Sequence, residues 1–77
     1  MPLSQQQKRD LKKLGARIKE LRKAKGMTQN ELANAVDMDY QNISRLERGE
    51  KNAVYLTIKE IARGLGVSMA ELLEGLD

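Results

Sequence analysis

The sequence predicts an all-α protein, a compact bundle of five short helices, and three observations lead to this fold class. The chain has 77 residues, 40% of them hydrophobic, which suits one domain with one core. Tyr40 and Tyr55 are its only aromatic residues, so the core must consist of Leu, Ile, Val, Met and Ala, which favour helices over sheets. Apolar residues at helical spacing also recur between helix-start signals along the chain.

The first predicted helix covers residues 11–25. Its apolar positions are spaced by three, four and three residues, at Leu11, Leu14, Ile18 and Leu21. Gly26 then suits the position after the last turn. Residues 4–10 are polar, and residues 1–10 are expected to be either flexible or an extension of this helix, whereas residues 11–77 are expected to form the folded domain.

The Ser/Thr-x-x-Glu capping box, which marks helix starts, predicts three further helices. It precedes apolar stretches of helical spacing at Thr28 and Glu31, at Thr57 and Glu60, and at Ser68 and Glu71. We interpret these glutamates as caps without a role in a functional site. The same pattern at Ser44 and Glu47 falls inside a helix expected at residues 39–49. A loop at residues 50–56 then leads to the fourth helix, which should end at Gly66.

The positive charge of the chain is concentrated at its N-terminal end. Residues 1–26 contain nine Lys and Arg against Asp10 and Glu20, whereas residues 27–77 contain five against nine acidic residues. One basic end on a small domain is typical of proteins that bind a polyanion. A solvated Lys and Arg face on the first helix would give the same imbalance, so charge alone leaves both interpretations open.

The composition argues against several other classes of protein. The sequence contains no Cys and no His, which excludes disulfides and leaves the usual zinc sites and most catalytic acid–base or nucleophilic arrangements without their residues. No apolar run reaches the roughly 18 residues of a membrane span, and the polar N-terminus does not resemble a secretion signal. We therefore expect a soluble, cytoplasmic protein that is not an enzyme and has no metal, cofactor or membrane partner.

Residues 28–49 combine two predicted helices around a very short connection. Only Asp37 and Met38 separate them, which makes the helices cross steeply, as in a helix-turn-helix. Ala33 is the small residue that such a close crossing needs. With the apolar side chains of both helices buried, the start of the second helix projects outward and is placed to enter a DNA major groove. The side chains expected there are Asp39, Tyr40, Gln41, Asn42, Ser44 and Arg45.

Three motifs in the chain resemble those of the phage-repressor and Cro-like regulators, also called the XRE family. They are MTQxELA at residues 27–33, IxxLExG at residues 43–49 and LGVS at residues 65–68, and the resemblance covers residues 14–75. It implies a lambda-repressor-like fold and a sequence-specific DNA-binding transcriptional regulator, a repressor or controller, of bacterial or phage type.

The resemblance also implies which residues contact DNA. Gln29 matches a residue that binds a phosphate and the recognition helix, and Thr28 beside it belongs to the expected DNA-binding set. The base-contacting positions are matched by Tyr40, Gln41 and Arg45, flanked by Asn42 and Ser44. The loop that follows the DNA backbone is matched by Lys51 and Asn52. These side chains suit the task, because Gln and Asn pair with adenine and Arg pairs with guanine.

Asp37 departs from the family pattern, which usually has Gly at this position of the turn. The position requires a left-handed backbone, and Asp tolerates that conformation better than most residues. The resemblance therefore implies a cost of about 1 kcal/mol at Asp37 without a change of fold.

Glu47 is expected to form a structural ion pair with Arg22. It falls on the same side of its helix as Ile43 and Leu46, so its carboxylate lies near the core and needs a partner. Arg22 follows Leu21 on the inner edge of the first helix, and the resemblance places an Arg there. A buried or half-buried pair would orient the helix-turn-helix against the first helix.

A homodimer on a double-stranded operator is expected, because regulators gain affinity by pairing half-sites about 34 Å apart. The C-terminal end contains more large apolar side chains than one helical face can bury. The expected dimerisation surface consists of Met69, Leu72, Leu73 and Leu76, with Val54 and Tyr55. The alternative is that Leu72 and Leu73 both close the core of a monomer.

A different function on the same fold is a protein-interaction module, such as an antitoxin that masks a toxin. DNA binding with a steep dependence on salt separates the two functions, because protein-only binding releases no counterions from DNA.

Overall fold

The computed structural model describes residues 2–76, and helices are the only regular elements in this range. They are α1 (Gln5–Ala24), α2 (Gln29–Ala35), α3 (Tyr40–Glu47), α4 (Tyr55–Leu65) and α5 (Met69–Leu72). The predicted all-α class with five helices is therefore confirmed.

α1 extends further toward the N-terminus than the apolar spacing indicates. It starts at Gln5, so residues 5–10 extend the helix, one of the two possibilities that the sequence leaves open. The Ser4 hydroxyl accepts a hydrogen bond from the backbone N–H of Gln7 (3.1 Å), and the Gln7 side chain accepts one from the N–H of Ser4 (2.8 Å). This reciprocal pair is the glutamine form of the capping box.

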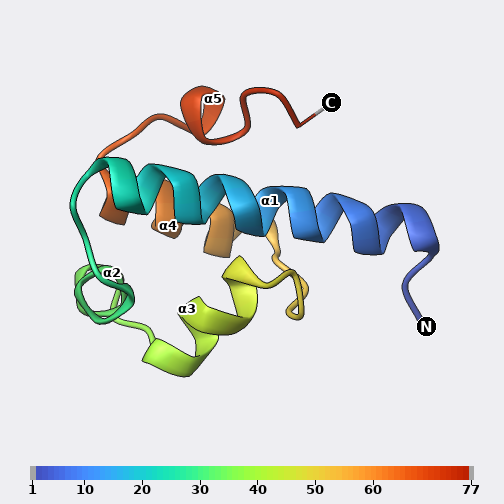
Figure 1. Cartoon of the computed structure of the whole chain (residues 1–77), viewed down its shortest axis with the longest axis horizontal. Coiled ribbons are helices and arrows are strands. Elements are labelled where there is room, and N and C mark those ends of the chain that lie inside the picture. The colour runs from blue at the N-terminus through green and yellow to red at the C-terminus, as the bar shows by residue number, and fades with distance from the viewer. Residues whose placement is uncertain (1, 77) are drawn as a thin grey trace.

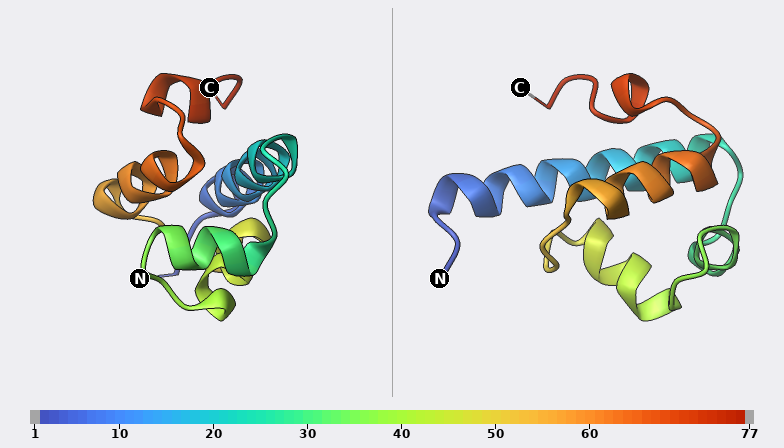
Figure 2. Two further views of the ribbon diagram at one scale, coloured as in Figure 1. Left: turned by 90° about the vertical axis from the view of Figure 1, so that its left-hand side faces the viewer. Right: turned by 180° about the vertical axis from the view of Figure 1, so that it is seen from behind.

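The other helices are arranged around α1, which spans most of the length of the molecule (Figure 1). α2 and α3 lie on one side of α1 and α5 lies on the opposite side, while α4 runs beside α1 (Figure 2). α1 contacts α3, α4 and α5, and α2 contacts α3 and α4. The first turns of α3 are thus held at the edge of the molecule farthest from α5.

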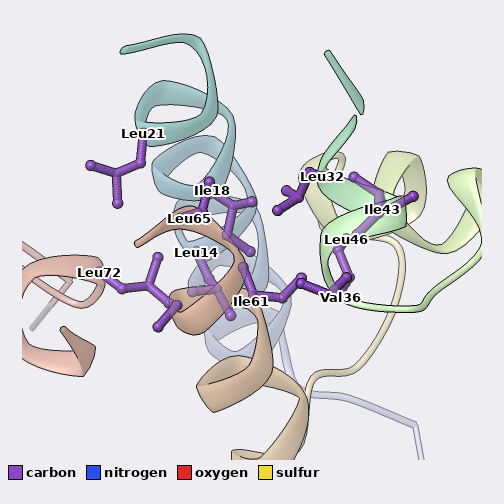
Figure 3. Packing of buried hydrophobic residues seen from close by; sticks show 12 residues of the cluster. Leu14, Ile18, Leu21, Leu32, Val36, Ile43, Leu46, Ile61, Leu65 and Leu72 are labelled. Carbon is purple, nitrogen blue, oxygen red and sulfur yellow. The ribbon is translucent and has the colours of Figure 1, made fainter. Parts of the chain in front are cut away.

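The core forms where these helices meet, and it is entirely aliphatic (Figure 3). The five core positions predicted between α2 and α3 are all at most 3% exposed: Leu32, Ala33, Val36, Ile43 and Leu46. Gly15 of α1 lets the first helix come close to the end of α3, because a Cβ on this residue would collide with the carbonyl oxygens of Leu46 and Glu47.

The connection between α2 and α3 has the geometry that the resemblance implies. Val36 caps the end of α2 and Asp39 precedes α3, which leaves Asp37 and Met38 between the caps. Asp37 has a φ of 54°, and no other non-glycine residue in the described part of the chain has a positive φ. The N–H of Met38 donates to the carbonyl oxygen of Ala33 (3.0 Å) and closes the turn.

The predicted start of the fourth helix is wrong. α4 begins at Tyr55 with Val54 as its N-cap, so Thr57 lies inside the helix and the preceding loop ends earlier than expected. Glu60 is not a cap, because its carboxylate instead accepts a hydrogen bond from Nε of Arg63 (3.0 Å), one turn further along α4. The end of α4 at Gly66 is as predicted.

Candidate nucleic-acid interface

The start of α3 exposes a polar face. Its opposite face is anchored by Ile43 and Leu46, which are 0% and 3% exposed. Of the six residues expected to project outward, Asn42 and Ser44 are half-buried, and the exposed ones are Asp39, Tyr40, Gln41 and Arg45. The fold therefore exposes four of the six predicted side chains at the start of α3.

Arg48 joins this surface, although the sequence analysis did not single it out. It lines a shallow hollow on α3 together with Tyr40, Gln41, Ser44 and Arg45. Its guanidinium donates a hydrogen bond to the Ser44 hydroxyl (2.7 Å) and pairs with Glu50 (3.2 Å). The signal for it was its position four residues after Ser44, which places both side chains on one helix face.

Asp39 precedes α3 but makes no capping hydrogen bond with its side chain. Its carboxylate is therefore not engaged by the helix and lies exposed at the edge of the polar face. A carboxylate in this position can accept a hydrogen bond from the amino group of cytosine.

Thr28 and Gln29 form the start of α2. The Thr28 hydroxyl accepts a hydrogen bond from the N–H of Glu31 (3.0 Å), and the Glu31 carboxylate accepts one from the N–H of Thr28 (2.8 Å). This capping box is as predicted. The Gln29 amide donates to the Glu47 carboxylate (2.9 Å), so the start of α2 is tied to the end of α3.

Arg22 and Glu47 form the ion pair that the sequence predicts. Nε of Arg22 donates to Oε2 of Glu47 (2.7 Å) and its Nη2 donates to Oε1 (3.2 Å). The third nitrogen donates to the carbonyl oxygen of Met27 (2.7 Å). Both side chains are buried, at 9% and 2% exposure, so each charge depends on the other for its stabilisation. α1, α3 and the segment before α2 are joined through this pair.

The loop between α3 and α4, residues 48–54, follows directly after the C-terminal end of α3. Lys51 is half-buried and Asn52 is exposed in this loop. Gly49 lies under α1, because a Cβ at this position would be 2.7 Å from the Cα of Lys12. The loop is therefore held in place by α1.

The predicted dimerisation set divides into buried and exposed members. The assignment of Leu72 to a surface is wrong, because this side chain is 0% exposed and belongs to the core. α5 has only four residues and directs Leu72 toward the core, while Met69 and Leu76 are partly buried beside it. Apart from Tyr40 on α3, the large apolar side chains that remain exposed are Val54 (62%), Tyr55 (64%), Leu56 (72%) and Leu73 (38%). Leu56, the next residue after Val54 and Tyr55, was not part of the predicted set.

No helix in residues 2–76 has both the length and the apolar composition to cross a membrane. Across the same residues, no cluster of three or more His, Cys, Asp or Glu side chains could hold a metal ion.

Comparison with known proteins places this architecture in a family. The family described as Helix-turn-helix matches residues 18–72. The chain is 41% identical over 69 residues to y4dJ, an HTH-type transcriptional regulator of Sinorhizobium fredii. The aligned residues make up 88% of this chain and 90% of that protein.

Two solved controller proteins have the same fold. The restriction-modification controller C.AhdI from Aeromonas hydrophila superposes with a TM-score of 0.80 at 38% identity, over 83% of this chain and 97% of that one. C.Esp1396I, solved as a tetramer in complex with its natural 35 base-pair operator, gives a TM-score of 0.81 at 37% identity. The match covers 87% of this chain and 88% of that one. The chain therefore belongs to the helix-turn-helix family of transcriptional regulators.

Proposed function

We propose that this protein is a sequence-specific transcriptional regulator that binds a double-stranded DNA operator as a homodimer, with α3 in the major groove. The observation that carries the proposal is the polar face at the start of α3. Gln41 and Arg45 lie exposed there while Ile43 and Leu46 anchor the same helix in the core. A rigid helix with Gln and Arg on its outer face matches the hydrogen-bonding edges of adenine and guanine.

Contacts to the DNA backbone are proposed on both sides of α3. Thr28 and Gln29 lie at the start of α2, and Lys51 and Asn52 lie in the loop between α3 and α4. Contacts to phosphates orient a protein on the duplex, whereas contacts to base edges select the sequence. Two backbone contacts that flank one recognition helix would fix the depth and angle of α3 in the groove.

Dimerisation is proposed through the apolar surface at the start of α4, formed by Val54, Tyr55 and Leu56. These three consecutive side chains are each more than 60% exposed, and adjacent exposed apolar side chains mark an interaction surface. A symmetric dimer would present two copies of α3 to half-sites about one helical turn apart. The operator-bound tetramer of C.Esp1396I, a relative of this fold, agrees with an oligomeric regulator.

This function requires no cofactor and no catalytic residue, and we accordingly propose that the protein is not an enzyme. A bacterial transcriptional regulator binds chromosomal DNA, which lies in the cytoplasm. We therefore propose a cytoplasmic location for this protein, whose relatives include bacterial regulators.

Selection of bound sites from random duplex DNA with the purified protein tests the proposal. We expect enrichment of an inverted repeat with half-sites centred about 10 base pairs apart, or a multiple of that spacing. Sedimentation equilibrium with the selected duplex should give two chains per site. A pool that does not differ from the starting library would contradict the proposed function.

A further inference from the structure

The N-terminal half of α1 and the loop between α3 and α4 enclose a hollow of about 400 Å³. The two segments touch where Lys12 passes over Gly49, as described above, and the hollow opens beside this contact. Figure 1 shows the loop lying below this half of α1. The polar and charged side chains that line the hollow include Lys8, Arg9, Lys12, Glu50 and Asn52.

The hollow is positively charged. Within residues 2–76, Lys8, Arg9 and Lys12 form no ion pair. Glu50, the acidic residue of the lining, is already paired with Arg48. Three cations that converge on one space repel one another, and an anion placed between them would relieve that repulsion.

The hollow also adjoins the proposed DNA-contacting surface. Its loop side includes Asn52, which follows Lys51, and these two residues are the proposed backbone contacts next to α3. A DNA strand that passes α3 and the loop would next reach the N-terminal half of α1.

We propose that Lys8, Arg9 and Lys12 bind phosphates of the DNA backbone outside the base pairs that α3 contacts. The partner is the phosphodiester backbone of the duplex that flanks the operator half-site, and the inference rests on the proposed function. It assigns a role to the basic end of the chain that a helix-turn-helix by itself does not require.

Lys13 provides a matched control. It follows Lys12 directly in α1 and is also exposed, but neighbouring helix residues point about 100° apart. Lys13 lines a different hollow, together with Arg17, Glu20 and Leu76. Lys12→Gln and Lys13→Gln thus each remove one positive charge from the same helical turn. Only Lys12→Gln removes it from the proposed phosphate-binding hollow.

The experiment measures the affinity for a duplex that carries the selected site with long flanks, over a series of salt concentrations. One lost phosphate contact lowers the slope of log K against log salt by about 0.9, which corresponds to about fivefold weaker binding at roughly 0.15 M salt. We expect this change in slope for Lys12→Gln and a change about twice as large for the double variant Lys8→Gln with Lys12→Gln. Lys13→Gln should bind with the affinity and salt slope of the wild type. Hydroxyl-radical footprints of the double variant should lose protection only at the outer edges of the site.

Two outcomes would overturn the inference alone: equal effects of Lys12→Gln and Lys13→Gln, or an unchanged footprint of the double variant. In both, the wild-type protein still binds its site and the proposed function stands. A wild-type protein that binds no duplex would instead contradict the proposed function itself. Circular dichroism of each variant establishes that the folded structure is retained.

Discussion

Gln29, at the start of α2, donates a 2.9 Å hydrogen bond to Glu47, at the end of α3. The same carboxylate is held by the guanidinium of Arg22 in α1. One buried acid of α3 therefore ties this helix to both α1 and α2 and so helps to fix its orientation in the fold. The residue proposed to bind a DNA phosphate, Gln29, is positioned through this acid.

Substitution of Glu47 should destabilise the fold. We expect Glu47→Ala to lower the free energy of unfolding by about 3 kcal/mol, because Arg22 is left as a buried charge without its partner. Urea denaturation followed by circular dichroism measures the change. The double substitution Arg22→Met with Glu47→Leu should recover much of the loss, since it leaves no isolated charge. If Glu47→Ala is as stable as the wild type, the pair does not stabilise this arrangement.

Substitutions on the outer face of α3 should affect sequence discrimination and not stability. Gln41→Ala and Arg45→Ala are each expected to reduce discrimination between the selected site and a mismatched site by about 1–3 kcal/mol. Thermal unfolding should remain nearly unchanged, because both side chains are exposed. Competition binding with single-base operator variants provides the measurement.

Lys51→Ala is the contrasting variant in the loop after α3. It should weaken binding to all sequences alike and lower the salt slope by about 0.9, the effect of one phosphate contact. If Gln41→Ala, Arg45→Ala and Lys51→Ala all shift specific and random DNA binding equally, the assignment of base contacts to α3 is wrong.

Leu56 and Leu72 should respond in opposite ways to substitution. Leu72→Ala is expected to cost about 2–5 kcal/mol of stability, because it leaves a cavity in the core. Leu56→Glu should leave the stability of the monomer unchanged and weaken self-association, since this side chain is 72% exposed. Sedimentation equilibrium and thermal unfolding separate the two effects. A Leu56→Glu protein that dimerises normally would place the interface elsewhere.

Asp37→Gly should stabilise the turn between α2 and α3. The φ of 54° is unfavourable for a residue with a Cβ, so glycine is expected to raise the free energy of unfolding by up to about 1 kcal/mol. Asp37→Val should lower it by about 1–2 kcal/mol, because β-branched residues fit a left-handed backbone poorly. Equal stabilities of the two variants in denaturation would show that the turn carries no strain.

Glu60 should titrate at a lower pH than an ordinary glutamate. Its pKa lies below the ordinary value of 4.5, chiefly because the Arg63 side chain donates a hydrogen bond to its carboxylate, with a smaller effect of the Arg63 charge. Because the folded pKa is depressed, the stabilising contribution is present above the unfolded pKa and is lost as the pH falls through the folded one. Carboxyl NMR titration should show the Glu60 pKa rising toward 4.5 in Arg63→Gln. An identical titration in both proteins would contradict the contact.

Features that depend on neighbours in the sequence could be predicted from the sequence alone. The spacing of Leu32, Val36, Ile43 and Leu46 indicates which faces of α2 and α3 are buried, because helical periodicity is a local property. The capping box at Thr28 is equally local. The left-handed turn at Asp37 and the pairing of Arg22 with Glu47 could be predicted once the family resemblance was recognised.

Other features were decided only by tertiary packing. The Thr57 pattern was as good a helix start as that of Thr28, but α4 begins earlier, at Tyr55. The Glu60 carboxylate is bound instead by Arg63, which the fold also places against α2, where it donates a hydrogen bond to the carbonyl oxygen of Ala35 (2.9 Å). Leu72 and Leu56 are chemically alike, and only the placement of α5 against the core and of the α4 start at the surface makes one buried and the other exposed. Lys8 and Lys12 became part of a candidate site because α1 passes over the loop at Gly49. Local spacing determines which side chains share a helix face, whereas burial depends on which helix that face meets.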